Sequence, residues 1–90
     1  MKWLGDPAAW EAVKARFPVG STVTGTVYDL APFGVFIDLG DDVVGLLLVP
    51  EMAGEGRKQM ADYPQIGQSV TAKVIHHRDA ECQVSLTQRT

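Results

Sequence analysis

Residues 22–28 read TVTGTVY and residues 33–39 read FGVFIDL, and these two stretches decide the fold. In both, apolar and polar side chains alternate with a period of two, which is typical of a β-strand with one buried face. In the second stretch this alternation points Phe36 and Asp38 outward and the aliphatic residues between them inward. Gly25 interrupts the first stretch, and glycine inside a strand often marks a sharp bend or a close backbone approach. The sequence therefore predicts two strands, the first of them strongly coiled.

The alternating pattern continues along most of the remaining chain. Residues 40–42 read GDD, a turn signal of the length and chemistry that suit a hairpin. A third strand is predicted at 43–49, a connection at 51–68 with a helical turn near 58–63, and two last strands at 69–77 and 81–87. Five antiparallel strands with a long connection between the third and the fourth describe an all-β Greek-key barrel of the oligonucleotide-binding (OB) type.

The segment before the first strand has helical rather than alternating spacing. Trp10, Val13 and Phe17 recur at intervals of three and four residues, which gives a helix over 6–17 one apolar face. Such a face needs an apolar partner, so we expect the helix to pack on the barrel. The predicted organisation is a helical extension at 1–18 followed by a barrel at 19–90.

Composition limits the kinds of partner. The chain has 90 residues, which is the size of one domain. Its 8 Lys and Arg against 11 Asp and Glu give a formal net charge of −3, which argues against tight, non-specific binding to phosphate backbones. No apolar run approaches the roughly 18–20 residues that cross a bilayer, and the start has no apolar core of signal-peptide length. We therefore expect a cytoplasmic chain that does not act on a membrane.

Neither a metal site nor a catalytic site is indicated. His76 and His77 are neighbours on a predicted strand, so they point to opposite faces and cannot chelate one ion together. The carboxylates of Asp38, Asp41 and Asp42 lack the spacing of a calcium loop. No nucleophile, base and orienting group stand together in the pattern. We expect no cofactor, no small-molecule substrate and no enzymatic activity.

The chain has a single cysteine, Cys82, which falls in the last predicted strand. Free cysteine in such a place behaves as a small apolar side chain. We expect Cys82 to be buried and unreactive.

The order of these segments is that of a known family. The chain resembles the S1-type RNA-binding domain over roughly residues 17–89, with conventional loop lengths between the matching segments. The segments that carry the resemblance are VGSTVTGTV at 19–27, FGVFIDLG at 33–40, GLL at 45–47, IGQSVTAKV at 66–74 and VSLT at 84–87. The resemblance implies a five-stranded OB barrel that binds single-stranded RNA on one face.

The resemblance also implies which side chains form that face. The family usually carries two aromatic residues on the second strand, and here they are Phe33 and Phe36. Every base has a π-face, and each stacked base contributes about 1–3 kcal/mol of binding free energy. Lys73 and Arg78 are expected on or beside the face, where they would meet phosphates unless they are ordinary surface charges. His77 is expected to reach the face from a strand end.

Three positions of the expected face depart from the family pattern. Leu48 stands where the family commonly has histidine, Pro50 where it has serine, and Gln83 where a basic residue is common. Two functions therefore stay open: weak binding of single-stranded RNA by stacking, or a protein–protein interaction module that docks a partner through the Phe36 and Leu48 face. A cold-shock-type barrel is a third, for which the denser aromatic and basic motif is missing. The expected RNA-binding residues are Phe33, Phe36, Leu48, Lys73, His77 and Arg78.

Overall fold

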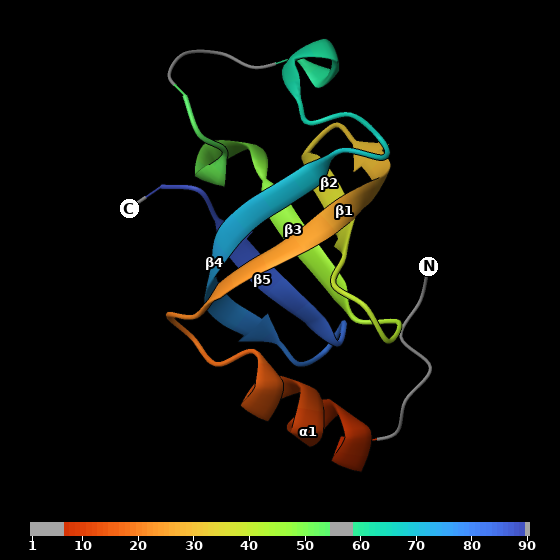
Figure 1. The fold of residues 1–90 in the computed structure, drawn as a ribbon, viewed down its shortest axis with the longest axis vertical. Helices are drawn as coiled ribbons and strands as arrows, with labels where there is room; N and C mark the ends of the chain where they lie inside the picture. The colour runs from red at the N-terminus through yellow and green to blue at the C-terminus, as the bar shows by residue number, and fades with distance from the viewer. Residues whose placement is uncertain (1–6, 55–58, 90) are drawn as a thin grey trace.

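Five strands wrap around one apolar core, and a helix lies across one end of the barrel that they form (Figure 1). This computed structural model describes residues 7–54 and 59–89, so the first six residues of the predicted extension lie outside the described part. The elements are the helix α1 (Pro7–Arg16), the strands β1 (Thr22–Ala31), β2 (Gly34–Asp38), β3 (Val44–Leu48), β4 (Ser69–Arg78) and β5 (Gln83–Thr87), and the 3-10 turns η1 (Val49–Glu51) and η2 (Met60–Asp62).

The strands follow one another around the closed barrel in the order β1-β2-β3-β5-β4, and β4 pairs back onto β1. This confirms the predicted five-stranded OB-type barrel with a short helix before it and a helical turn between β3 and β4. The prediction that all strands are antiparallel is wrong, because β3 and β5 run parallel. Five strands in a closed ring cannot alternate in direction all the way round, so one neighbouring pair has to be parallel.

The inward faces of all five strands meet in one cluster of buried side chains. Val35 and Ile37 of β2 are fully buried, as the alternation of that stretch predicts. Trp10 and Val13 of α1 belong to the same cluster, and Phe17 packs against it, so the helix closes one end of the core. The other buried members are Val27, Val43, Leu47, Met52, Tyr63, Val70, Ala72, Val74, Val84 and Leu86.

β1 is the strand that serves both sides of the barrel. Its first half, Thr22–Thr26, pairs with β4, while the part from Thr26 to Ala31 pairs with β2. At Gly25 a Cβ atom would lie 2.5 Å from Cγ2 of Ile37 and 2.6 Å from the carbonyl oxygen of Asp38. Glycine is thus required here by a close approach between strands, as the sequence indicates.

The last hairpin differs in detail from its prediction. β5 begins at Gln83 rather than at residue 81, because the turn before it is longer. The N–H groups of Glu81 and Cys82 donate to the carbonyls of Arg78 and Asp79, at 3.2 and 3.3 Å. Cys82 ends this turn with a positive φ of 52°. Its side chain is half-buried against the core rather than enclosed in a strand.

A carboxylate on the same turn holds α1 in place. Asp79 Oδ1 accepts hydrogen bonds from Trp10 Nε1 at 2.8 Å and from Lys14 Nζ at 3.1 Å. The Trp10 hydrogen bond first, and then that from Lys14, lower the pKa of Asp79 below its ordinary value. Lys14 is also paired with Glu11 at 3.0 Å, and these two hydrogen bonds raise the pKa of Lys14.

The close approach at Gly25 predicts a large penalty for any side chain there. Gly25→Ala should lower the free energy of unfolding by about 1–3 kcal/mol, because overpacking against another strand's backbone forces both strands apart. The measurement is urea unfolding. Thr26→Ala, at the exposed neighbouring position, is the control and should change stability little. Equal stability of the two variants would contradict the packing described for β1.

The lowered pKa of Asp79 predicts how α1 responds to acid. Because the folded pKa lies below the unfolded value near 3.8, the ionised carboxylate stabilises the fold above that pH. This contribution is lost as the pH falls through the lower folded pKa. The indole N–H resonance of Trp10 should shift in that acidic range, and in Asp79→Ala it should already be shifted at neutral pH. Asp42→Ala is the control, and an unchanged Trp10 resonance in Asp79→Ala would refute the contact.

Candidate nucleic-acid interface

One row of paired residues crosses four strands on the outside of the barrel. Phe36 of β2 pairs with Leu46 of β3, Leu46 with Ser85 of β5, and Ser85 with His76 of β4. Paired residues on neighbouring strands point to the same side of a sheet, so these four side chains share one outer face. The parallel pairing of β3 with β5 is what makes this row continuous.

Three aromatic rings stand at the β1–β2 end of this row, and we call Tyr28, Phe33 and Phe36 the aromatic end. Phe33 is 52% exposed, whereas Phe36 and Tyr28 are half-buried. The rings of Phe33 and Phe36 meet edge-on, with centroids 5.9 Å apart and an interplanar angle of 87°. Tyr28 also lies beside Phe36, with ring centroids 6.2 Å apart. Tyr28 was not predicted; it joins the cluster because β1 has an irregularity between Val27 and Asp29.

The turn that carries Phe33 is held by hydrogen bonds from both sides. Tyr63, a buried residue of the β3–β4 connection, donates from Oη to the carbonyl of Pro32 at 2.7 Å. The N–H of Val49 donates to the carbonyl of Phe33 at 3.0 Å. Gly34 packs so closely on β3 that a Cβ there would collide with the carbonyl oxygen of Leu47. An exposed aromatic ring is therefore mounted on an ordered backbone.

Leu48 lies beside this turn, paired with Gly34 across β2 and β3. Its side chain is half-buried. The structure thus brings Phe33, Phe36 and Leu48 to one region of the outer face, as the sequence predicts for their strands.

At the other end of the face stand the polar side chains of β4, and we call His76 and Arg78 the basic end. Arg78 pairs with Gln83 on the outer side of β5, and its Nε lies 3.6 Å from Glu81 Oε2. His76 is exposed. Three inter-strand steps separate this end from Phe36, a distance of about 14 Å along the surface.

The structure places His77 elsewhere than expected. An irregularity between Val74 and His76 inserts an extra residue into β4 and reverses the alternation after it. His77 therefore pairs with buried Val84 and turns toward α1, where its Nε2 lies 2.7 Å from the carbonyl of Phe17. Its ring also meets Trp10 edge-on, with centroids 6.3 Å apart. His76 takes the outward position, which strict alternation along the sequence assigns to His77.

Lys73 lies nearer the start of β4, before the irregularity. It is exposed and pairs with Thr87 of β5 on one side and Thr22 of β1 on the other. Within the part of the chain that the structure describes, Lys73 has no carboxylate in ion-pair range.

The middle of the row offers little accessible surface. Leu46 is 2% exposed and Ser85 9% exposed, although both lie on the outer side of their strands. A ligand would therefore contact the two ends of the face and little of the surface between them.

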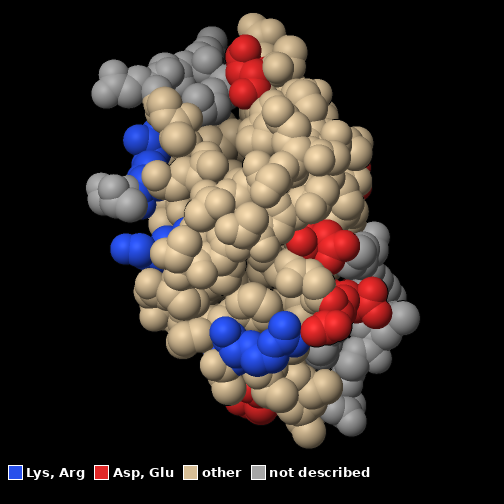
Figure 2. All heavy atoms as spheres, viewed as in Figure 1, with Lys and Arg blue, Asp and Glu red and all other residues tan. Residues whose placement is uncertain are grey.

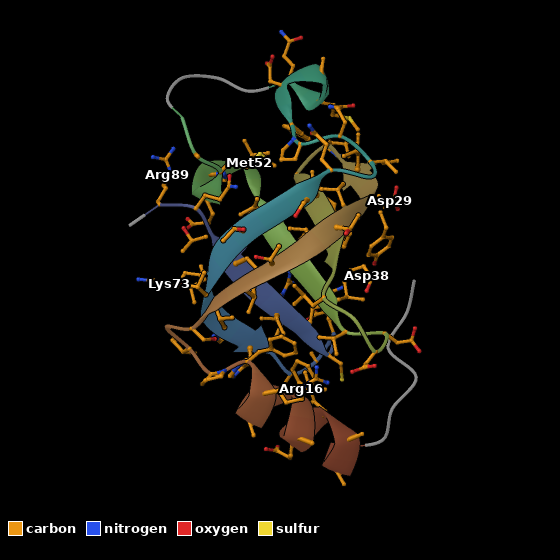
Figure 3. All side chains as sticks on the ribbon, in the orientation of Figure 1. Arg16, Asp29, Asp38, Met52, Lys73 and Arg89 are labelled. Carbon is orange, nitrogen blue, oxygen red and sulfur yellow. The ribbon has the colours of Figure 1, made fainter. Side chains whose placement is uncertain are left out.

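Charge is divided between the two edges of the barrel. Figure 2 shows basic side chains along the left edge and several acidic ones on the right, with a further basic group at the lower front and acidic groups also at the top and the bottom. In Figure 3 Lys73 and Arg89 lie on the first of these edges, and Asp29 and Asp38 on the second. The carboxylates adjoin the aromatic end: the pKa of Tyr28 is raised, first by burial and then by Asp29 and Asp38. A phosphate would be disfavoured at that edge.

The described residues contain no group of three His, Cys, Asp or Glu side chains that could hold a metal ion. Nor does any helix among them have the length and apolar character needed to cross a membrane.

Comparison with known proteins gives relatives in both sequence and structure. Small ribosomal subunit protein bS1 of Chlamydia trachomatis is 35% identical over 81 residues, which are 90% of this chain but 14% of that protein. The solution structure of GSP13 from Bacillus subtilis matches with a TM-score of 0.72 and 30% identity, over 81% of this chain and 56% of that one. The a/eIF2alpha-aDim2p-rRNA complex from Pyrococcus horikoshii OT3 matches with a TM-score of 0.70 and 27% identity, over 79% of this chain and 44% of that one.

The relatives are thus mostly longer than this chain, which corresponds to one barrel within them. The model of the S1 RNA binding domain matches residues 16–89, which include every strand of the barrel. This chain belongs to the S1 RNA-binding domain family.

Proposed function

We propose that this chain binds single-stranded RNA weakly, with bases stacked on the aromatic end and phosphates beside the basic end and Lys73. The observation that carries the proposal is Phe33, which is 52% exposed and lies edge-on to Phe36 on a backbone fixed by its neighbours. An exposed ring in an ordered turn is costly to leave in water, and a nucleic-acid base is a ligand that covers it well.

The preference for single strands follows from the kind of surface. Bases within a duplex are already stacked on one another, so their faces are not available to Phe33 or Phe36. An unpaired strand can turn its bases onto the rings without loss of pairing. The Pyrococcus neighbour was solved in a complex with rRNA, which supports an RNA ligand for this chain as well.

Weak binding follows from the charges. The net charge is −3, and Asp29 and Asp38 adjoin the aromatic end. Arg78 is partly neutralised by Glu81. Few phosphates would therefore be neutralised, and most of the binding free energy would come from stacking, which salt does not screen.

A protein partner is the second candidate function, and the half-buried Leu48 beside the exposed Phe33 is the observation that favours it. Capture from lysate with and without ribonuclease separates the two functions. A specific protein that survives ribonuclease, and is lost on Leu48→Asp, would support docking. Recovery of proteins only while RNA is intact would rule out the docking function.

The stacking proposal predicts the effect of removing the central ring. Phe36→Ala should weaken binding of a fluorescent single-stranded RNA by roughly 5- to 150-fold, the equivalent of one or more stacked bases. Affinity would be measured by fluorescence anisotropy across a salt series, and the logarithmic salt slope should be only about 1–3. Val19→Ala, an exposed apolar position outside the face, is the control. A steep slope, or equal affinity for duplex, would contradict stacking as the main source of affinity.

The hydrogen bond from Tyr63 predicts a second, smaller effect. Tyr63→Phe removes one oxygen and leaves the carbonyl of Pro32 without its donor. We expect the free energy of unfolding to fall by about 0.5–1.5 kcal/mol and RNA affinity to fall by roughly 2- to 10-fold, because the turn carrying Phe33 is loosened. Nitrogen-15 relaxation at Phe33 measures the loosening directly. Unchanged relaxation and affinity would show that Tyr63 does not position this turn.

A further inference from the structure

A groove opens beyond Lys73, on the side of the barrel formed by β4 and β1 and away from the aromatic end. Its volume is about 330 Å³. It is lined by Thr22, Thr71, Lys73, Thr87 and Gln88, with Ala53 and Ala72. A neighbouring groove of about 380 Å³ shares Ala53, Thr71 and Gln88 with it, so the two grooves adjoin.

Two side chains of the groove, Gln88 and Lys73, carry hydrogen-bond donors without partners among the described residues. Oε1 of Gln88 accepts the backbone N–H of Ala53 at 2.9 Å. A side-chain amide accepts a hydrogen bond through its oxygen and not through its nitrogen, so this bond fixes the orientation of the Gln88 amide. Its two amide N–H bonds, and the ammonium of Lys73, have no acceptor among the residues that the structure describes.

None of the described residues that line this groove carries a carboxylate, although the chain has a net charge of −3. In the neighbouring groove the one lining acid is Asp62, whose Oδ2 already accepts the N–H of Gln59 at 3.0 Å. A cation and an amide donor in a lining whose described residues include no acid form a surface that favours an anion.

The groove adjoins the proposed RNA face. Lys73 pairs with Thr87, the last residue of β5, and Leu48 follows directly on Leu47, which pairs with Leu86 of β5. A strand whose bases stack on the aromatic end and which passes Leu48 would thus reach Thr87 and then the groove.

We propose that this groove is a second subsite, which binds a backbone phosphate of the same single-stranded RNA through Lys73, Gln88 and Thr22. The proposal rests on the proposed function. Lys73 supplies the charge, and the Gln88 amide and the Thr22 hydroxyl supply directed hydrogen bonds to phosphate oxygens. The subsite would lengthen the stretch of RNA that the barrel holds.

Oligonucleotide length and three matched variants test this subsite. Lys73→Gln, Gln88→Glu and Arg16→Gln each lower the net charge by one unit, and they differ only in where the change lies. Gln88→Glu keeps the oxygen that accepts the Ala53 N–H, so the local fold should persist while the donor becomes an anion. Arg16 lies on α1 in an ion pair with Asp41, away from Lys73 (Figure 3), and is the control.

RNA of about four and of about twelve nucleotides would be compared, a range that spans the site sizes of OB barrels. For the long RNA we expect Gln88→Glu and Lys73→Gln to bind roughly tenfold more weakly than the parent, as loss of a hydrogen bond to a charged group predicts. For the short RNA, the Gln88→Glu variant should bind with the same affinity as Arg16→Gln. Neutral methylphosphonate linkages, placed singly along the long RNA, should weaken parent binding at one position and leave Gln88→Glu insensitive there.

The possible failures can be told apart. If the parent binds RNA but Gln88→Glu and Lys73→Gln match Arg16→Gln at both lengths and at every linkage, the groove is not a subsite and Lys73 is not a phosphate contact, while stacking on the aromatic end still stands. If the parent binds neither RNA, the proposed function fails and the subsite with it.

Discussion

A closed ring of five strands cannot alternate in direction all the way round, and the molecule meets this constraint by pairing β3 with β5 in parallel. Closure leaves no strand edge exposed, which matters in a chain of 90 residues with a small core. The same parallel pairing connects Phe36 of β2, through β3 and β5, with His76 of β4. Residues that are 40 positions apart in the sequence therefore share one outer face.

That face has an aromatic end and a basic end, which differ in chemistry. Its aromatic end is partly exposed, and the turn that carries Phe33 is held in place by hydrogen bonds from Tyr63 and Val49. Its basic end is thinly charged because Arg78 is paired with Glu81. Asp29 and Asp38 lie on the edge opposite Lys73 and Arg89 (Figure 3). We propose that affinity for RNA comes mainly from stacking on the aromatic end and is limited by the acidic charge of the chain. In our proposal Lys73 and its groove extend the same surface around β4, where none of the described lining residues is an acid.

Much of the fold could be predicted from the alternation of side chains, because burial of one face imposes a period of two along each strand. Val35 and Ile37 are buried accordingly, and Gly25 lies where β1 and β2 approach closely. His77 shows the limit of this reasoning. Nothing in the local sequence reveals that β4 gains an extra residue after Val74, since that irregularity arises from pairing with β5. Tyr28 joined the aromatic end through a similar irregularity in β1.

The most direct test of this account is the map of amide shifts when isotope-labelled protein is titrated with short single-stranded RNA at low and physiological salt. The account predicts saturable shifts at Phe33, Phe36, His76 and Arg78, with His77 unchanged and with duplex RNA causing little effect. Shifts centred on His77 and α1, or equal shifts with duplex, would contradict the assignment of the outer face of β2, β3, β5 and β4 as the RNA surface.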